Sequence, residues 1–206
     1  MATKWWNKDE SIPFENSNFQ KILDFYLFKC PCEIKKNQKN KNIIYMPVSS
    51  RNNTFRKQGW IGGKLNTLRS AMRHTSSKNL EYHIIPQKNE IVAESNRVED
   101  NASFGEPHFE MIVISERSDM SKTSAIFYYI RNALAHGSFG TTLSSGKRTY
   151  YFESTKDGVV KARIRLREET LLSWIHLFFD SPNALKISLE QNRKNNKKYK
   201  RSSNVA

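Results

Sequence analysis

The sequence predicts a mainly helical α+β fold, in which a bundle of helices carries one inserted β-hairpin. Apolar residues recur every three or four positions in several segments, as expected of amphipathic helices that bury one face. The dipeptide Asp157-Gly158 separates two β-prone runs and is typical of a two-residue hairpin turn. These signals place four main helices at residues 17–30, 60–73, 119–136 and 167–179, and a hairpin at residues 149–164.

Length and charge indicate one domain with a basic tail. The chain has 206 residues, a net charge of +14 and a mean hydropathy of −0.70. We expect a single domain over residues 1–191 and a disordered basic tail over residues 192–206. So much positive charge favours polyanionic partners, with RNA, DNA and anionic membranes as candidates.

The sequence predicts neither a membrane span nor a metal site. No apolar run reaches the ~20 residues that a spanning helix needs, and the N-terminus lacks the apolar core of a signal peptide. Cys30 and Cys32 are separated by one residue and have no second Cys/His pair at zinc spacing, so reduced thiols are expected. We therefore expect a cytoplasmic protein that binds no metal and no cofactor.

The other segments are assigned from composition. A Lys/Asn tract predicts a mobile loop, a Gly/Ser/Thr tract predicts a second loop, and a polar stretch before Pro107 predicts a third. One apolar run predicts a short strand, a second fits either a buried strand or a short core segment, and a third, around Pro86, fits either a helix or a strand. The loops are residues 33–42, 140–148 and 96–107, and the three apolar runs are, in that order, residues 43–50, 108–115 and 80–95.

The helix at 119–136 has two different faces. Ser118 or Asp119 is expected to cap its start, and Gly137 is placed to end it in the left-handed conformation. At about 100° per residue, one side is a continuous apolar stripe. The other side carries Arg131, Asn132 and His136, with Asn132 and His136 as i,i+4 neighbours. The residues between them are mostly small, which leaves room for a close partner: Ser121, Ser124, Ala125 and Ala135.

This helix resembles the signature helix of the HEPN superfamily. The run Arg131-Asn132-Ala133-Leu134-Ala135-His136 matches the Arg-x4-His signature in its Arg-Asn-x-x-x-His form. The resemblance implies a HEPN-like helical bundle and a metal-independent endoribonuclease, typically a toxin or effector of toxin–antitoxin, abortive-infection or antiviral defence systems. It also implies a homodimer in which two copies of the motif face each other, with an antitoxin or other defence-system protein as a further partner.

The chemistry of the three side chains suits RNA cleavage by attack of the 2′-hydroxyl. His136 can act as acid or base near neutrality, and Arg131 can bind two phosphate oxygens. Asn132 can donate to a non-bridging oxygen or orient the imidazole. We therefore predict Arg131, Asn132 and His136 as catalytic residues. Lys147 and Arg148 follow shortly after and are predicted to bind RNA.

Two other readings of the motif stay open. A HEPN-like domain could bind RNA or regulate without turnover, or Arg131 and His136 could only stabilise a helix C-terminus, where cations are favoured. The run from Gly140 to Arg148 is a poor match to a phosphate-binding loop, because its spacing and its preceding helix are wrong. His176 lies among aromatic residues and is expected to be buried. Toxins regulated by tyrosine modification carry Tyr two residues after the motif His, where this chain has Ser138.

Overall fold

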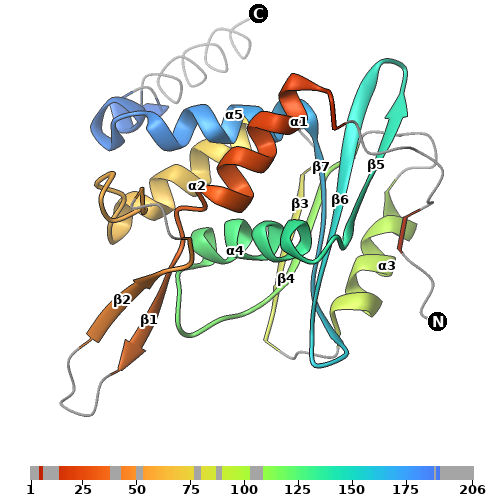
Figure 1. Ribbon diagram of the computed structural model, residues 1–206, viewed down its shortest axis with the longest axis horizontal. Helices are drawn as coiled ribbons and strands as arrows, with labels where there is room; N and C mark the ends of the chain where they lie inside the picture. Colours follow the sequence, from red (N-terminus) through yellow and green to blue (C-terminus); the bar gives the residue numbers. More distant parts are fainter. Residues whose placement is uncertain are drawn as a thin grey trace, which may run out of the picture.

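A five-stranded mixed β-sheet lies at the centre of the structure, with helices on both of its faces (Figure 1). The structure is a computed structural model and describes residues 5–6, 14–37, 43–49, 53–76, 80–86, 90–102, 109–187 and 189–190. Neighbouring strands follow the order β3-β4-β7-β6-β5; β3 and β4 are parallel, and the other pairs are antiparallel. The strands are β3 (Glu81–Ile85), β4 (Met111–Ser115), β5 (Phe139–Ser144), β6 (Lys147–Lys156) and β7 (Val159–Arg167).

The helices form two unequal layers. The larger layer covers one face of the sheet, the smaller covers the other, and a separate two-stranded hairpin projects beside the larger layer (Figure 1). The larger layer contains α1 (Ser17–Ile22), the π-helical segment η1 (Leu23–Phe28), α2 (Gly63–Thr75), α4 (Lys122–Ala135) and α5 (Glu168–Phe179). The smaller layer is α3 (Ile91–Asn101), and the separate hairpin is β1 (Glu33–Asn37) with β2 (Ile43–Pro47).

The prediction of a mainly helical bundle with an inserted hairpin was wrong, because the sheet is a full layer of the fold. The predicted hairpin exists, but its strands β6 and β7 lie in the middle of the sheet. Two of the predicted loops contain strands. Residues 33–42 begin with β1, and residues 140–148 hold most of β5 and the start of β6. Both strands were predicted as loops because many of their residues are polar. A strand with one polar face has few apolar residues by which the sequence could reveal it.

Two similar turns join β5, β6 and β7. Ser145 and Gly146 have φ angles of 50° and 74°, and Asp157 and Gly158 have φ angles of 52° and 73°. Positive φ at both central positions is the requirement of the two-residue turn that matches strand twist. The sequence prediction recognised the Asp-Gly turn and missed the equivalent Ser-Gly turn.

Strand β4 separates two hydrophobic clusters. All five of its residues are buried. Ile112 and Ile114 point into the main cluster under the larger helical layer, whereas Met111 and Val113 pack against α3. A strand buried on both faces reads as a continuous apolar run, which is why a buried strand was one of the two predictions for residues 108–115, and it is confirmed.

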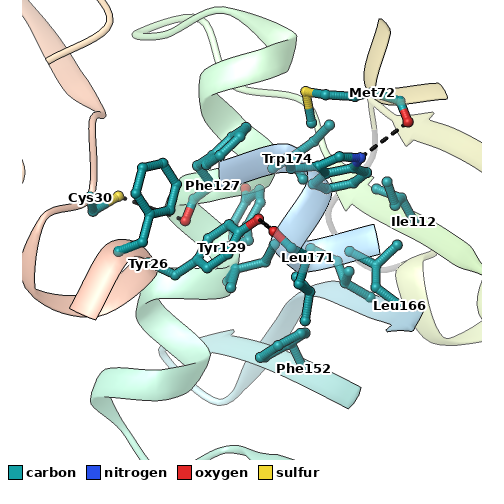
Figure 2. Close-up of a cluster of buried hydrophobic side chains, with 14 of the residues drawn as sticks. Tyr26, Cys30, Met72, Ile112, Phe127, Tyr129, Phe152, Leu166, Leu171 and Trp174 are labelled. Carbon is teal, nitrogen blue, oxygen red and sulfur yellow. Dashed lines mark hydrogen bonds between the residues drawn. The ribbon is translucent and has the colours of Figure 1, made fainter. Parts of the chain in front are cut away.

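Aromatic side chains with satisfied polar atoms hold the helices of the main cluster together (Figure 2). The Trp174 indole N–H donates to the Met72 carbonyl oxygen at 3.1 Å, which links α5 to α2. The Tyr26 hydroxyl donates to the Leu171 carbonyl oxygen at 2.9 Å, which links η1 to α5. Phe127 of α4 stacks on Tyr26 with ring centroids 5.5 Å apart. These contacts fix α4 between the sheet and its neighbouring helices.

The remaining assignments differ from prediction mainly at boundaries. The first helix was predicted at 17–30, and its second half is π-helical, with the Lys29 N–H donating to the Asp24 carbonyl at 2.9 Å. The ambiguous run 80–95 contains both β3 and the start of α3, and α3 extends into the predicted loop 96–107.

His176 is exposed, contrary to prediction. The predicted tail lies outside the described residues. Among those residues no helix is both long and apolar enough to span a bilayer.

Candidate functional site at the end of helix α4

Helix α4 begins three residues later than predicted. Its N-cap is Ser121, whose hydroxyl accepts a hydrogen bond from the Ser124 N–H at 3.0 Å. The predicted caps lie in the preceding loop. Asp119 binds Arg117 instead, and its carbonyl accepts from the Lys35 N–H of the β1–β2 hairpin at 2.8 Å.

Backbone groups close the C-terminus of α4. Gly137 has a φ of 62°, as predicted for the left-handed residue after the helix. The Ser138 N–H donates to the Ala133 carbonyl at 2.8 Å, and the Gly137 N–H donates to the Leu134 carbonyl at 3.2 Å. This paired arrangement satisfies carbonyl groups of the last turn. The side chains of Arg131 and His136 are therefore not required as caps.

Arg131 has no acidic partner in the structure. Its guanidinium Nη1 lies 3.4 Å from Asn132 Oδ1, and no carboxylate of the described residues is within 4 Å. Its Nε atom is buried without a hydrogen-bond partner. His136 is exposed, and its side chain makes no hydrogen bond within the described chain. The structure thus brings Arg131 and Asn132 into contact and leaves His136 open to solvent one turn away.

Lys147 and Arg148 lie away from this group. They begin β6, where Lys147 pairs with Ser144 at the far end of β5 from α4. The span from residue 139 to residue 144 is roughly 17 Å at about 3.3 Å per residue. Lys147 is exposed, whereas Arg148 is largely buried and binds Glu168 (Nε to Oε2, 3.8 Å) and the Thr141 hydroxyl (3.2 Å).

Two of the four small residues singled out on α4 are covered by their own chain. Ser124 and Ala125 are only 6% and 3% exposed. The Cys32 thiol donates to the Ser124 carbonyl oxygen at 3.0 Å, so the segment leading into β1 packs directly on this part of the helix. The small side chains at these two positions accommodate intramolecular neighbours. Besides Lys122 in the first turn, the exposed positions of α4 and its C-cap are Ala135 and His136.

A polar cavity adjoins the site on the other side of Asn132. Its volume is about 260 Å³, and it lies between α4, the β4–α4 loop and the β6–β7 hairpin. Lysines from the hairpin and an arginine from the loop contribute cationic groups, and α4 contributes two tyrosines and Asn132: Lys156, Lys161, Arg117, Tyr128 and Tyr129. Sequence analysis did not single out these residues. The turn at Asp157-Gly158 places the two lysines at one end of the hairpin, but only the folded sheet places that end beside α4.

Arg117 is held in place on the cavity wall. Its Nε donates to Asp119 Oδ1 at 2.8 Å, and its Nη2 binds the other carboxylate oxygen. The guanidinium carbon lies 4.1 Å from the centroid of the Tyr128 ring. These hydrogen bonds from Arg117 lower the pKa of Asp119 below its ordinary value, although partial burial opposes the shift.

Comparisons with protein-family models, with curated proteins and with solved structures find no match for this chain. Within the described residues, no three His, Cys, Asp or Glu side chains gather in a way that could hold a metal ion. The resemblance to HEPN proteins accordingly depends on residues 131–136 and their place at the end of α4.

Proposed function

We propose that this protein is a metal-independent endoribonuclease with Arg131, Asn132 and His136 at its site. The observation that carries the proposal is the unpaired guanidinium of Arg131. A half-buried arginine usually binds a carboxylate, because burying an uncompensated charge is unfavourable. Arg131 instead contacts an amide through Nη1, and no described residue accepts a hydrogen bond from its Nη2, so the terminal nitrogens of the guanidinium suit an external phosphate.

The proposed reaction is an internal transesterification. The 2′-oxygen attacks phosphorus, the P–O5′ bond breaks, and the products are a 2′,3′-cyclic phosphate and a 5′-hydroxyl. One proton leaves the 2′-hydroxyl and one reaches the 5′-oxygen, so the proton count balances. Arg131 stabilises the charge that grows on the phosphorane oxygens, and Asn132 fixes the guanidinium. His136 transfers a proton at one of the two oxygens.

A homodimer is part of the proposal. One imidazole serves one proton transfer at a time, and a second copy of the motif would supply the other group. Support comes from the exposed last turn of α4, where Ala135 leaves little bulk beside His136. Sedimentation at micromolar concentration is expected to give a dimer. A fully active monomer would contradict this part of the proposal. A role in defence, with or without an antitoxin, follows from the family resemblance alone and stays a prediction.

The test is incubation of total RNA with purified protein in excess EDTA. Wild type is compared with Arg131→Ala and His136→Ala, and Arg97→Ala is the matched control because Arg97 lies on α3 and pairs with Glu94. Cleavage by wild type and the control, lost in both site variants, is the expected result. Cleavage that persists in both site variants would refute the assignment.

A non-catalytic RNA-binding domain is the second candidate. It is favoured by one observation: no side-chain hydrogen bond joins His136 to Arg131 or Asn132 among the described residues. Binding of RNA that is weakened by Arg131→Ala, without cleavage by wild type under any condition of the assay, would select this candidate.

A further inference from the structure

The polar cavity beside Asn132 carries more positive charge than its acidic residues neutralise. Among its lining residues, Arg117 is bound by Asp119, and Glu116 lies 3.9 Å from Lys122 Nζ. Lys156 and Lys161 also line it and make no ion pair with any described carboxylate. Two lysines therefore line the same space, and neither makes an ion pair with a described carboxylate, although the charge of Lys156 contributes to lowering the pKa of Asp119.

The two lysines project from neighbouring strands of one rigid hairpin. Lys156 ends β6 and pairs with Val159, and Lys161 follows two residues later on β7. Lys156 is exposed, whereas Lys161 is half-buried. The tight turn between the strands holds both side chains at the mouth of the cavity. A hairpin of this kind presents its ammonium groups to a ligand with little loss of backbone freedom on binding.

Asn132 connects the cavity to Arg131. Its Oδ1 accepts from Arg131, so its two N–H donors are left for a ligand in the cavity. Arg117 and the Tyr128 ring stack against each other on the same wall. Flat guanidinium and aromatic groups are the surfaces on which proteins stack nucleobases. Phosphate-binding cations, amide donors and a stacking surface thus line one cavity.

We propose that this cavity binds a single nucleoside phosphate, with Lys156 and Lys161 on the phosphate and Tyr128 and Arg117 beside the base. The volume of about 260 Å³ lies just below the range of roughly 300–1,000 Å³ usual for drug-sized ligands, so the cavity holds one nucleotide at most. Two sources share this chemistry: the nucleotide next to the cleaved phosphodiester of an RNA, or a free mononucleotide. The first source rests on the proposed ribonuclease function, and the second does not.

The test measures binding of a fluorescent nucleoside monophosphate to the full chain. The Lys156→Gln/Lys161→Gln variant is compared with Lys64→Gln/Lys186→Gln, which removes the same charge from exposed positions that do not line the cavity. We expect binding to weaken about tenfold or more only in the cavity variant, the order expected when charge-assisted hydrogen bonds are lost. Equal weakening in both variants, or no binding by wild type, would overturn the proposal.

Competition by a 2′-O-methyl RNA oligonucleotide, which cannot be cleaved through its 2′-oxygen, separates the two sources. Displacement of the nucleotide identifies the cavity as an RNA subsite, and retention identifies a free-nucleotide site. The slope of log affinity for this oligonucleotide against log salt should fall by about 1.4 in the cavity variant if both lysines contact RNA phosphates. Nucleotide binding without RNA cleavage would retain the cavity and refute the ribonuclease. Cleavage without nucleotide binding would retain the ribonuclease and refute the nucleotide site in the cavity.

Discussion

The arginines of the sheet and the arginine at the end of α4 have opposite surroundings. On β7, Arg163 binds Glu153 at 2.9 Å and the side-chain oxygens of Ser95 and Asn96 at 3.2 Å. Arg131 is also partly buried, yet among the described residues its guanidinium donates only to the amide oxygen of Asn132. Removing one partner of a buried ion pair is strongly destabilising, so the sheet arginines are parts of the fold. A buried cation without a carboxylate adds little to stability, which leaves anion binding as its contribution.

The same contrast, between a cation with a carboxylate partner and one without, distinguishes Arg148 from Lys156 and Lys161. Arg148 is occupied by Glu168, which also accepts from the Tyr150 hydroxyl at 2.9 Å and from Asn18 at 2.9 Å. Burial, followed by the charge of Glu168, raises the pKa of the Tyr150 hydroxyl. Among the described residues, Lys156 and Lys161 make no ion pair. Charge alone therefore does not identify a ligand site in a chain of net charge +14, and the proposed nucleotide site rests on lysines without an ion-pair partner.

The largest effect is expected from Arg131→Gln. This change removes the positive charge while keeping polar atoms near Asn132. We expect the rate of RNA cleavage to fall about 100- to 1,000-fold, the cost of losing one transition-state donor. The free energy of unfolding should change by less than about 1 kcal/mol. Single-turnover kinetics and urea unfolding measure the two quantities. A large stability loss with an unchanged rate would place Arg131 with the sheet arginines.

The second largest effect is expected from Arg163→Gln, on the free energy of unfolding. We expect a loss of about 3 kcal/mol in the free energy of unfolding, because Glu153 loses its partner on a largely buried surface. The cleavage rate per folded molecule should stay unchanged. Urea unfolding measures the loss, and Arg97→Gln, at an exposed pair on α3, should cost much less. Equal costs at both positions would remove the distinction between buried and exposed pairs.

A smaller effect distinguishes Arg148 from Lys147, the two residues predicted from sequence to bind RNA. Arg148→Gln should destabilise the fold by about 1–2 kcal/mol through Glu168 and Thr141. Lys147→Gln should leave stability within about 0.5 kcal/mol. Thermal unfolding and filter-binding with RNA, performed on both variants, give the comparison. If Arg148→Gln weakens RNA binding without destabilising the fold, its pairing with Glu168 is not structural.

The smallest effect concerns pH. The pKa of Asp119 is lowered in the folded state by hydrogen bonds from Arg117. Its contribution to stability is therefore present above its unfolded pKa of about 3.9 and is lost as pH falls below that value toward the folded pKa. Urea unfolding at pH 6 and pH 3 should show a smaller pH-dependent loss in Asp119→Asn than in wild type. Identical losses in the two proteins would mean that the ion pair contributes nothing.

Local signals predicted the four main helices and one turn, but not α3. The apolar spacing of α4 and α5, the glycine after His136 and the Asp157-Gly158 turn each involve residues within a few positions of one another. The sheet depends on distant pairs instead. Ile112 of β4 lies opposite Ile164 of β7, and no local pattern specifies that register. Gly140 is a second example of a contact that no local pattern specifies. The Trp6 ring occupies the space that a Cβ atom at position 140 would need.

The site divides in the same way. Arg131, Asn132 and the end of the helix were predictable because they share one turn of α4. The cavity was not, since Lys156 and Lys161 reach Asn132 only through the pairing of β6 with β7 and the packing of α4 on the sheet. The small residues of α4 were predicted to leave room for a close partner. Ser124 packs against the segment around Cys32, whose position the helix pattern could not reveal, whereas Ala135 is exposed.

The most direct test of the central claim uses an oligonucleotide with one ribonucleotide in a 2′-deoxy background, incubated with the protein in EDTA. The account predicts cleavage only after the ribonucleotide, with a 2′,3′-cyclic phosphate on one product and a 5′-hydroxyl on the other. Arg131→Gln should form neither product at a comparable rate. Cleavage at 2′-deoxy positions, or products with a 3′-hydroxyl and a 5′-phosphate, would contradict attack by the 2′-oxygen at the end of α4.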